Sequence, residues 1–253
     1  MTASRIVADI RQGIADGQYR HGTRLPSVRD LADQYGVSQQ TAAAAYAVLA
    51  ALGLARSERG SGTTVAAGPA ADAYLGTYTP PDLDAPGAQA WRATNEGATA
   101  TEETTLVRQI VATDEMAEWG IPSGSDVVER TRIRSLEGIP VQHKITVVPY
   151  DLASRRPEGY EGVPPMLAPV GAAPMKPPRG TRVADWLGWD VQKTDCAITA
   201  EPMAADACTA LLMPEGSPGF RVVNVSRDGA DSVVYATVTT APLHHRVTME
   251  IIG

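Results

Sequence analysis

The sequence has no long hydrophobic run. Its apolar stretches fall far short of the about 18 residues that a membrane-spanning helix needs, so we expect no segment to cross a bilayer. The N-terminus carries acidic residues and a helical pattern in place of the hydrophobic core of a secretory signal. Cysteine is scarce: Cys196 and Cys208 occur without a Cys-x-x-Cys motif or a Cys/His cluster. Two buried free thiols are favoured over a disulfide, which would form only if the fold brought the pair together, and we expect a cytoplasmic protein.

Motifs for catalysis are missing as well. Residues 98–253 contain no nucleophile motif, metal cluster or phosphate-binding loop, and an enzyme needs a positioned nucleophile, acid or base. His244 and His245 lack nearby cysteine or acidic ligands, so a metal site there is the less expected interpretation. We therefore expect no cofactor, no metal and no enzymatic activity.

Lysine is absent from the first 66 residues, where seven arginines face five acids for a net charge of +2. The other 187 residues hold 15 basic and 24 acidic side chains, a net charge of −9. The total of −7 by itself argues against a nucleic-acid binder. The asymmetry between the two parts instead indicates two functions, and the length of 253 residues fits one large domain or two modest ones.

Residues 1–66 have the pattern of three helices and a hairpin. Apolar residues recur at helical spacing over 4–15. Ser27 with Asp30 three residues later predicts the start of a second helix that ends near residue 36, and Ser38 predicts the start of a third. The expected inward face of that third helix consists of Thr41, Ala45, Val48, Leu49 and Leu52. With a glycine-tipped hairpin at 58–62, this order describes a winged helix-turn-helix domain.

The rest of the chain divides into a linker and a mixed domain. Residues 67–97 are rich in Ala, Gly, Pro, Asp and Thr without periodicity, which predicts a linker with a strand or a short helical turn near its end. Residues 98–253 contain hairpin-joined strands with helices set aside, which predicts an antiparallel α+β domain. The expected strands are 104–111, 127–134, 141–148, 220–226 and 233–240, the expected helices are 115–119 (capped by Asp114) and 204–212, and 157–178 is expected to be irregular.

Several motifs occur in the order and spacing of a known family. Leu25–Ala32, Tyr35–Ser38 and Gly60–Val65 resemble the winged helix-turn-helix of the GntR superfamily of bacterial transcription regulators. Gly120–Gly124 and the Arg132–Arg134 region resemble the ligand-sensing UTRA domain of its HutC branch. The resemblance covers most of the chain. It implies a chorismate-lyase-like fold for 98–253, binding of double-stranded DNA and of a small effector, and a homodimer.

The resemblance implies that the third helix enters the major groove with its first residues at base edges. Gln39 and Gln40 can pair with adenine, although a solvated helix face is the alternative. Family members usually carry Arg at the position of Gln39. The Gln in this chain therefore disfavours guanine recognition by the third helix and shifts the positive charge to arginines elsewhere. The wing glycines allow close approach to the minor groove, or simply a tight hairpin. The residues expected to contact DNA are Arg24, Ser27, Arg29, Ser38, Gln39, Gln40, Thr41, Arg59, Gly60, Ser61, Gly62 and Thr63.

Three arginines alternate along the strand 127–134, so that Arg130, Arg132 and Arg134 share one face. Like charges in this arrangement need an anionic ligand or acids across the sheet. In the domains it resembles, the Arg-x-Arg pair binds a phosphate or carboxylate of the ligand, so effector-binding roles are carried over to Arg132 and Arg134. Lys144 stands near the position of an acid in amino-sugar-binding relatives, which implies an anionic effector without an amine.

The expected function is a DNA-binding transcriptional repressor that a small anionic effector releases from a near-palindromic operator. A lyase-like enzyme is one rival. A regulator whose second domain only dimerises is another. Trp186 and Trp189 lie near the place of a Ser-Leu-Tyr segment in relatives, and packing in the core is favoured for them over stacking on a ligand.

Overall fold

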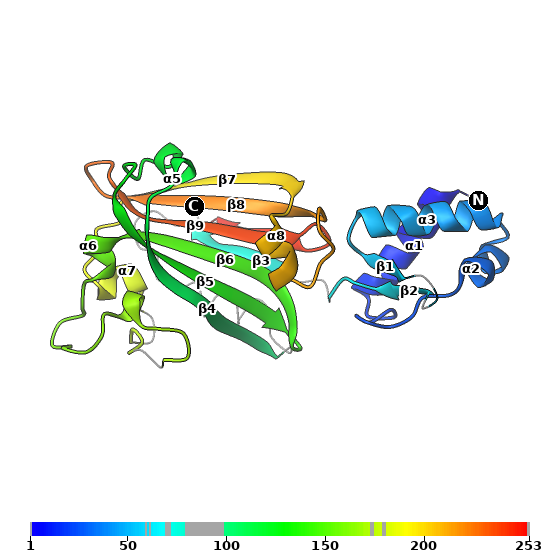
Figure 1. Cartoon of the computed structure of the whole chain (residues 1–253), viewed down its shortest axis with the longest axis horizontal. Coiled ribbons are helices and arrows are strands. Elements are labelled where there is room, and N and C mark those ends of the chain that lie inside the picture. Colours follow the sequence, from blue (N-terminus) through cyan, green and yellow to red (C-terminus); the bar gives the residue numbers. More distant parts are fainter. Residues whose placement is uncertain are drawn as a thin grey trace.

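The computed structural model describes residues 2–58, 60, 62–68, 72–78, 99–172, 175–178 and 181–251, with the backbone alone for 72–78 and 247–251. Figure 1 shows two groups of elements: three helices with a small hairpin, and a large sheet with short helices against it. Within these ranges, no helix is long and apolar enough to cross a membrane.

The N-terminal group contains the three expected helices and the expected hairpin. Its elements are α1 (Ala3–Ala15), α2 (Val28–Tyr35), α3 (Gln39–Ala51), β1 (Ala55–Glu58) and β2 (Gly62–Val65). The isoleucines of α1 pack against Leu31 of α2 and Leu49 of α3 in one hydrophobic core. Gly36, in a left-handed conformation, ends α2, as is common at helix C-termini. The winged helix-turn-helix prediction is confirmed.

The inward face of α3 differs from the expected one. Its buried residues are Ala42, Ala45, Tyr46 and Leu49, whereas Val48 is 45% exposed. Ala45 and Leu49 were expected, but the buried face also contains Ala42, whose small side chain lets α3 approach α1 closely, and Tyr46, which has a polar partner. The Tyr46 hydroxyl donates a hydrogen bond to the carbonyl of Pro26, which satisfies the polar end of the buried ring.

The second group is built on a six-stranded antiparallel sheet with the strand order β4-β5-β6-β9-β8-β7. The strands are β4 (Ala100–Val111), β5 (Asp126–Leu136), β6 (Ile139–Pro149), β7 (Lys193–Pro202), β8 (Pro218–Arg227) and β9 (Val233–Pro242). Five of them cover the predicted strands, so the antiparallel α+β class is confirmed. β7 was not predicted.

Short helices cover both faces of this sheet. On one face, Val127, Val147 and Ala236 pack with Met116 of α5 (Asp114–Glu118). On the other, Val128 and Val148 belong to a second hydrophobic cluster. Other residues of this cluster come from α6 (Tyr150–Ala153), the 3-10 helix η1 (Pro165–Leu167), α7 (Val183–Trp186) with the residues that follow it, and β9. α8 (Ala205–Ala210) follows β7 along the chain.

Several local expectations need correction. The cap of α5 is Thr113, whose hydroxyl accepts from the Met116 amide, and Asp114 is the first helical residue. Cys208 is buried, but Cys196 is exposed because it lies on an edge strand, and both thiols are free. In the linker, β3 (Asp72–Tyr78) pairs in parallel with β10 (Arg246–Ile251). The sequence predicted a strand or a short helical turn near the end of the linker, whereas β3 lies near the beginning of 67–97. The end of the linker falls outside the described residues.

Candidate nucleic-acid interface and anion site

The first turn of α3 presents polar side chains to solvent. The Ser38 hydroxyl caps the helix by accepting a hydrogen bond from the Thr41 amide at 3.1 Å, and its oxygen lies 2.9 Å from the Thr41 hydroxyl. Gln39 and Gln40 are exposed directly after this cap. The cap leaves both amide side chains at a helix N-terminus, which is the part of a recognition helix that meets base edges.

Two predicted arginines lie on exposed positions around this helix. Arg29 is exposed in the first turn of α2, where the hydroxyl of the capping Ser27 accepts from the Asp30 amide at 3.1 Å. Arg24 is exposed in the preceding loop, and its backbone forms an isolated β-bridge with Thr64 of the wing. The described surface therefore carries positive charge near α2 and the wing rather than on α3 itself.

Gly62 makes room for the Arg24 side chain at the wing. A Cβ atom built on Gly62 would lie 2.9 Å from Nε and from Nη2 of Arg24. Gly62 and Gly60 also have positive φ angles of +85° and +88°, a conformation that favours glycine. Arg59 and Ser61, the other expected wing residues, lie outside the described residues. Thr63 is buried, with its hydroxyl oxygen 2.9 Å from that of Ser57, so a contact with DNA from this position would come from its backbone.

Replacing Gly62 with alanine is expected to weaken DNA binding more than replacing Gly60. Alanine at either position strains the hairpin by about 1 kcal/mol because φ is positive at both. Only at Gly62 does the new methyl group displace the guanidinium of Arg24, since nothing lies within 4 Å of a Cβ at Gly60. Anisotropy titrations with an operator selected from genomic DNA, paired with unfolding curves, measure both effects. Equal losses of affinity in the two variants would show that Arg24 has no role at the wing.

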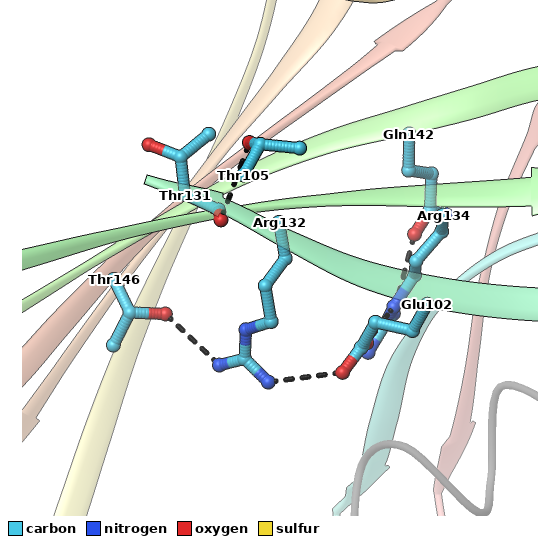
Figure 2. Close-up of polar contacts among 7 residues, drawn as sticks. All are labelled: Glu102, Thr105, Thr131, Arg132, Arg134, Gln142 and Thr146. Carbon is cyan, nitrogen blue, oxygen red and sulfur yellow. Dashed lines mark hydrogen bonds and ion pairs between the residues drawn. The ribbon is translucent and has the colours of Figure 1, made fainter. Parts of the chain in front are cut away.

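The predicted effector residues meet on one face of the large sheet. Arg132 Nη1 lies 3.0 Å from one carboxylate oxygen of Glu102, and Arg134 Nε lies 2.6 Å from the other. Figure 2 shows Glu102 between the two guanidinium groups, with Gln142 and Thr146 on the neighbouring strand β6. Gln142 accepts from Arg134 at 3.2 Å, and Thr146 accepts from Arg132 at 3.3 Å. The two arginines are thus held in fixed orientations.

Lys144 joins this group through strand pairing. It lies directly opposite Arg132 in the β5–β6 register, which places both side chains on the same face. Its side chain keeps some exposed surface, yet it lies deep among protein atoms. This burial, together with Arg134 and Arg132, lowers the pKa of Lys144 to about 7. The lysine is therefore poised to gain or lose its charge near neutral pH.

Among the described residues, the charges on this face do not balance. Burial by itself raises the pKa of Glu102, but Arg132 and Arg134 outweigh it and lower that pKa to about 2. Glu102 is therefore ionised at neutral pH, and it is the one carboxylate among the described residues that acts on Lys144. The Nε atom of Arg132 is buried and has no hydrogen-bond partner in the described part of the chain. A cluster with excess cations and an unused donor is suited to a further anion.

Arg130 has a structural position beside this cluster. Its side chain is buried, and its Nη1 donates to the carbonyls of Pro165 and Met166 at 3.0 and 2.8 Å. It therefore attaches η1 to the sheet. Trp189 is also structural, because it is buried and donates from Nε1 to the carbonyl of Leu152 at 3.1 Å. Trp186 is partly buried and packs against the hydrophobic cluster that contains Trp189, so both tryptophans pack in the core.

Glu102 is the site residue that the sequence did not reveal. Three arginines on one strand face required an anion or an acid opposite them. The sequence contains two adjacent glutamates, Glu102 and Glu103, and does not show which of them faces the arginines. The register of β4 against β5, with a shift between Thr104 and Leu106, decides which of them meets the arginines. A slip by one residue would have exchanged the two carboxylates between the faces.

Known proteins resemble the chain over both groups of elements. The family model described as bacterial regulatory proteins, gntR family, matches residues 2–65. The chain is 30% identical over 223 residues to the HTH-type transcriptional regulator SCO4628 of Streptomyces coelicolor, covering 85% of this chain and 77% of that protein. It is 41% identical over 75 residues to the vitamin B6 salvage pathway transcriptional repressor PtsJ of Salmonella typhimurium, covering 30% of this chain and 17% of that protein.

A crystal structure described as a GntR-family transcriptional regulator shares the fold, with a TM-score of 0.56, 23% sequence identity and coverage of 99% of this chain and 97% of that chain. The winged helix-turn-helix joined to an antiparallel α+β domain defines a DNA-binding transcription regulator. The chain belongs to the GntR family.

Proposed function

We propose that this protein is a homodimeric repressor of the HutC branch that releases its operator when a small anionic effector binds Arg132, Arg134 and Lys144. In this proposal, residues 1–66 bind DNA, 67–97 form the linker, and 98–253 form the UTRA effector and dimerisation domain. The observation that carries the proposal is the cationic cluster, in which Arg132, Arg134 and Lys144 act on one described carboxylate. Repression fits the relative PtsJ, which is a repressor and is 41% identical to this chain over 75 residues.

On the DNA side, the exposed Gln39 and Gln40 face the major groove and read adenine, while Ser38 and Thr41 contact phosphates. The DNA backbone is contacted by Arg24, Ser27 and Arg29 and by Arg59–Thr63 of the wing. The N-terminal part carries a net charge of only +2, so nonspecific attraction is weak and specificity rests on a few placed side chains doubled by a dimer.

The DNA proposal is tested by the salt dependence and the sequence preference of binding. A dimer of this chain neutralises about six to ten phosphates, so affinity falls steeply as salt is raised. Half-sites about one helical turn apart are expected, because they match a two-fold dimer. Genomic selection of bound DNA provides the operator, and a scrambled duplex of the same composition is the control. Equal affinity for both at about 150 mM salt would overturn sequence-specific binding.

On the effector side, the anionic group binds between Lys144 and Arg132, whose Nε has no hydrogen-bond partner among the described residues. Its charge competes with Glu102 for the two arginines, so β4 and β5 are held differently with and without the ligand. A ligand that binds one arrangement better shifts the population toward it, and the linker transmits the change to the winged helices.

The chief rival function is a regulator whose second domain only dimerises, and the observation that favours it is the pairing of Arg132 and Arg134 with Glu102. Thermal unfolding in the presence of sulfate, phosphate esters and carboxylates separates the two. A raised unfolding temperature together with release of the operator supports an effector. No shift with any anion and no turnover of any of these compounds would favour the rival.

Sulfate binding is expected to weaken as the pH rises from 6 to 8. Lys144 has a pKa of about 7 in the folded protein, so it loses the charge that attracts the anion over this interval, whereas Glu102, with a pKa of about 2, stays ionised. Sulfate keeps its own charge throughout, unlike phosphate. Calorimetric titration at several pH values should show a loss of affinity approaching tenfold.

Lys144→Met is the control for this pH dependence. It should bind sulfate weakly and with a flat pH profile, because the group that titrates has been removed. An unchanged slope in this variant would assign the pH dependence to another group.

A further inference from the structure

A groove with a volume of about 230 Å³ lies where the N-terminal group of elements meets the second group. Helix α1 and Leu54, which precedes β1, line it from the N-terminal group, and His244, which follows β9, lines it from the second group. The two groups touch at the residue before Leu54. A Cβ atom built on Gly53 would lie 2.5 Å from Cε of Met213 and 2.9 Å from the hydroxyl oxygen of Ser217. The groove therefore exists only while the two groups are in contact.

His244 is a polar residue of this groove without a partner. Both of its ring nitrogens are buried, and neither makes a hydrogen bond with another described residue. Burial lowers the pKa of His244 to about 4; the backbone of Gly68 acts against this shift, and Arg11 adds to it. The ring is therefore neutral at pH 7 and has one N–H donor and one acceptor. Because the χ2 torsion of histidine is soft, a small rotation turns a ring nitrogen toward the groove.

Arg11 supplies the positive charge of the groove. Its side chain is exposed, and no acidic side chain is among the described residues that line the groove. Ile14 and Leu54 add apolar surface and are almost fully buried. The guanidinium binds a carboxylate through two parallel hydrogen bonds, and small-molecule sites combine a few such polar groups with apolar walls.

We propose that this groove binds a small carboxylic acid with a compact apolar body. Its carboxylate bridges Arg11 and the N–H of His244, and its apolar part packs against Ile14 and Leu54. The site is separate from the cluster of arginines and lysine on the large sheet, so it does not depend on the effector of the proposed function. A ligand here contacts both groups of elements and favours the arrangement in which they touch. Its affinity is coupled to DNA binding to the extent that DNA changes this arrangement.

Benzoate is the probe for this site, and benzamide, which has nearly the same size without the charge, is the matched control. Proton NMR of the full-length protein follows the ring signals of its four histidines, and His244→Phe identifies the signal of His244. Benzoate should shift this signal in a saturable way and leave that of His143, in the large sheet, unchanged. Benzamide should bind at least about tenfold more weakly, because it cannot pair with Arg11.

Two variants of α1 test the charge and the space separately. Arg11→Gln should weaken benzoate binding about tenfold. Arg5→Gln is its control, since Arg5 is a 69% exposed arginine of the same helix that does not line the groove. Ala8→Leu fills the groove without changing a charge and should also weaken binding. No saturable shift of the His244 signal, or equal affinities in Arg11→Gln and Arg5→Gln, would overturn the groove as a carboxylate site.

Arg132→Gln separates this site from the cationic cluster on the large sheet. The affinity of benzoate measured at the His244 signal should be unchanged in this variant. If Arg132→Gln abolished benzoate binding and Arg11→Gln did not, the carboxylate would bind at the cationic cluster. That result would overturn the groove site and leave the proposed function intact.

Discussion

Replacing Arg132 with Gln is expected to weaken sulfate binding by about 10- to 100-fold and to leave DNA binding without ligand unchanged. Arg132 supplies a buried Nε without a partner among the described residues, and a charge-assisted hydrogen bond contributes about 1.5–3 kcal/mol. Every 1.4 kcal/mol corresponds to about tenfold in affinity. The variant should therefore behave as a repressor that anions no longer release from the operator.

The fold should survive this change, because Glu102 keeps its contact with Arg134 at 2.6 Å. Arg132→Lys keeps the charge but loses the planar fork, so it should bind with intermediate affinity. Lys176→Gln removes one positive charge at an exposed position and is the control for net charge. Calorimetry with sulfate and anisotropy with the operator measure the two activities. If Arg132→Gln and Lys176→Gln bind sulfate equally well, the anion does not bind at Arg132.

Replacing Glu102 with Gln is expected to lower the free energy of unfolding by about 3 kcal/mol. The Glu102 carboxylate is shared by two arginines, and the Arg134 side chain is only 5% exposed. Removing the carboxylate therefore leaves buried positive charge without compensation. Sulfate should restore much of the lost stability, because an anion can take the place of the carboxylate. Chemical unfolding with and without sulfate measures this, and Glu103→Gln, an exposed neighbour on the same strand, should cost little.

The same residue determines part of the acid sensitivity of the protein. The pKa of Glu102 is lowered from 4.5 to about 2 by the arginines, so the folded state holds the ionised form more strongly than the unfolded state does. Its contribution to stability is complete above pH 4.5 and is lost as the pH falls toward 2. Unfolding curves of Glu102→Gln at several pH values should lack this loss of stability below pH 4.5. A variant as stable as the wild type at pH 7, and equally sensitive to acid, would show that the carboxylate does not compensate the arginines.

Local patterns predicted the N-terminal part well. Cap residues such as Ser27 and Ser38 act within one turn of their helices, so their hydrogen bonds follow from the sequence alone. Hairpins of the large sheet were predicted from alternation and turn residues for the same reason. The face of α3 was not, because burial of Tyr46 in place of Val48 depends on the neighbouring helices.

The cationic cluster of Arg132, Arg134 and Lys144 was predicted in part. Alternation along β5 places Arg132 and Arg134 on one face in any sheet. The β5–β6 hairpin brings Lys144 to them only because the register shifts between Arg134 and Ser135, which places Lys144 opposite Arg132. Glu102 comes from β4, which joins β5 through a connection that contains α5. A pattern within one strand carries no information on that pairing.

The sequence by itself determined the family, the order of helices and hairpins, and the pair of arginines that face one way, because each depends on neighbours within a few residues. Tertiary structure alone decided that Glu102 rather than Glu103 meets these arginines and that β7 lies exposed at an edge. β7 escaped prediction because a strand exposed on both faces has no hydrophobic alternation, and register between distant strands is set by packing of the whole sheet.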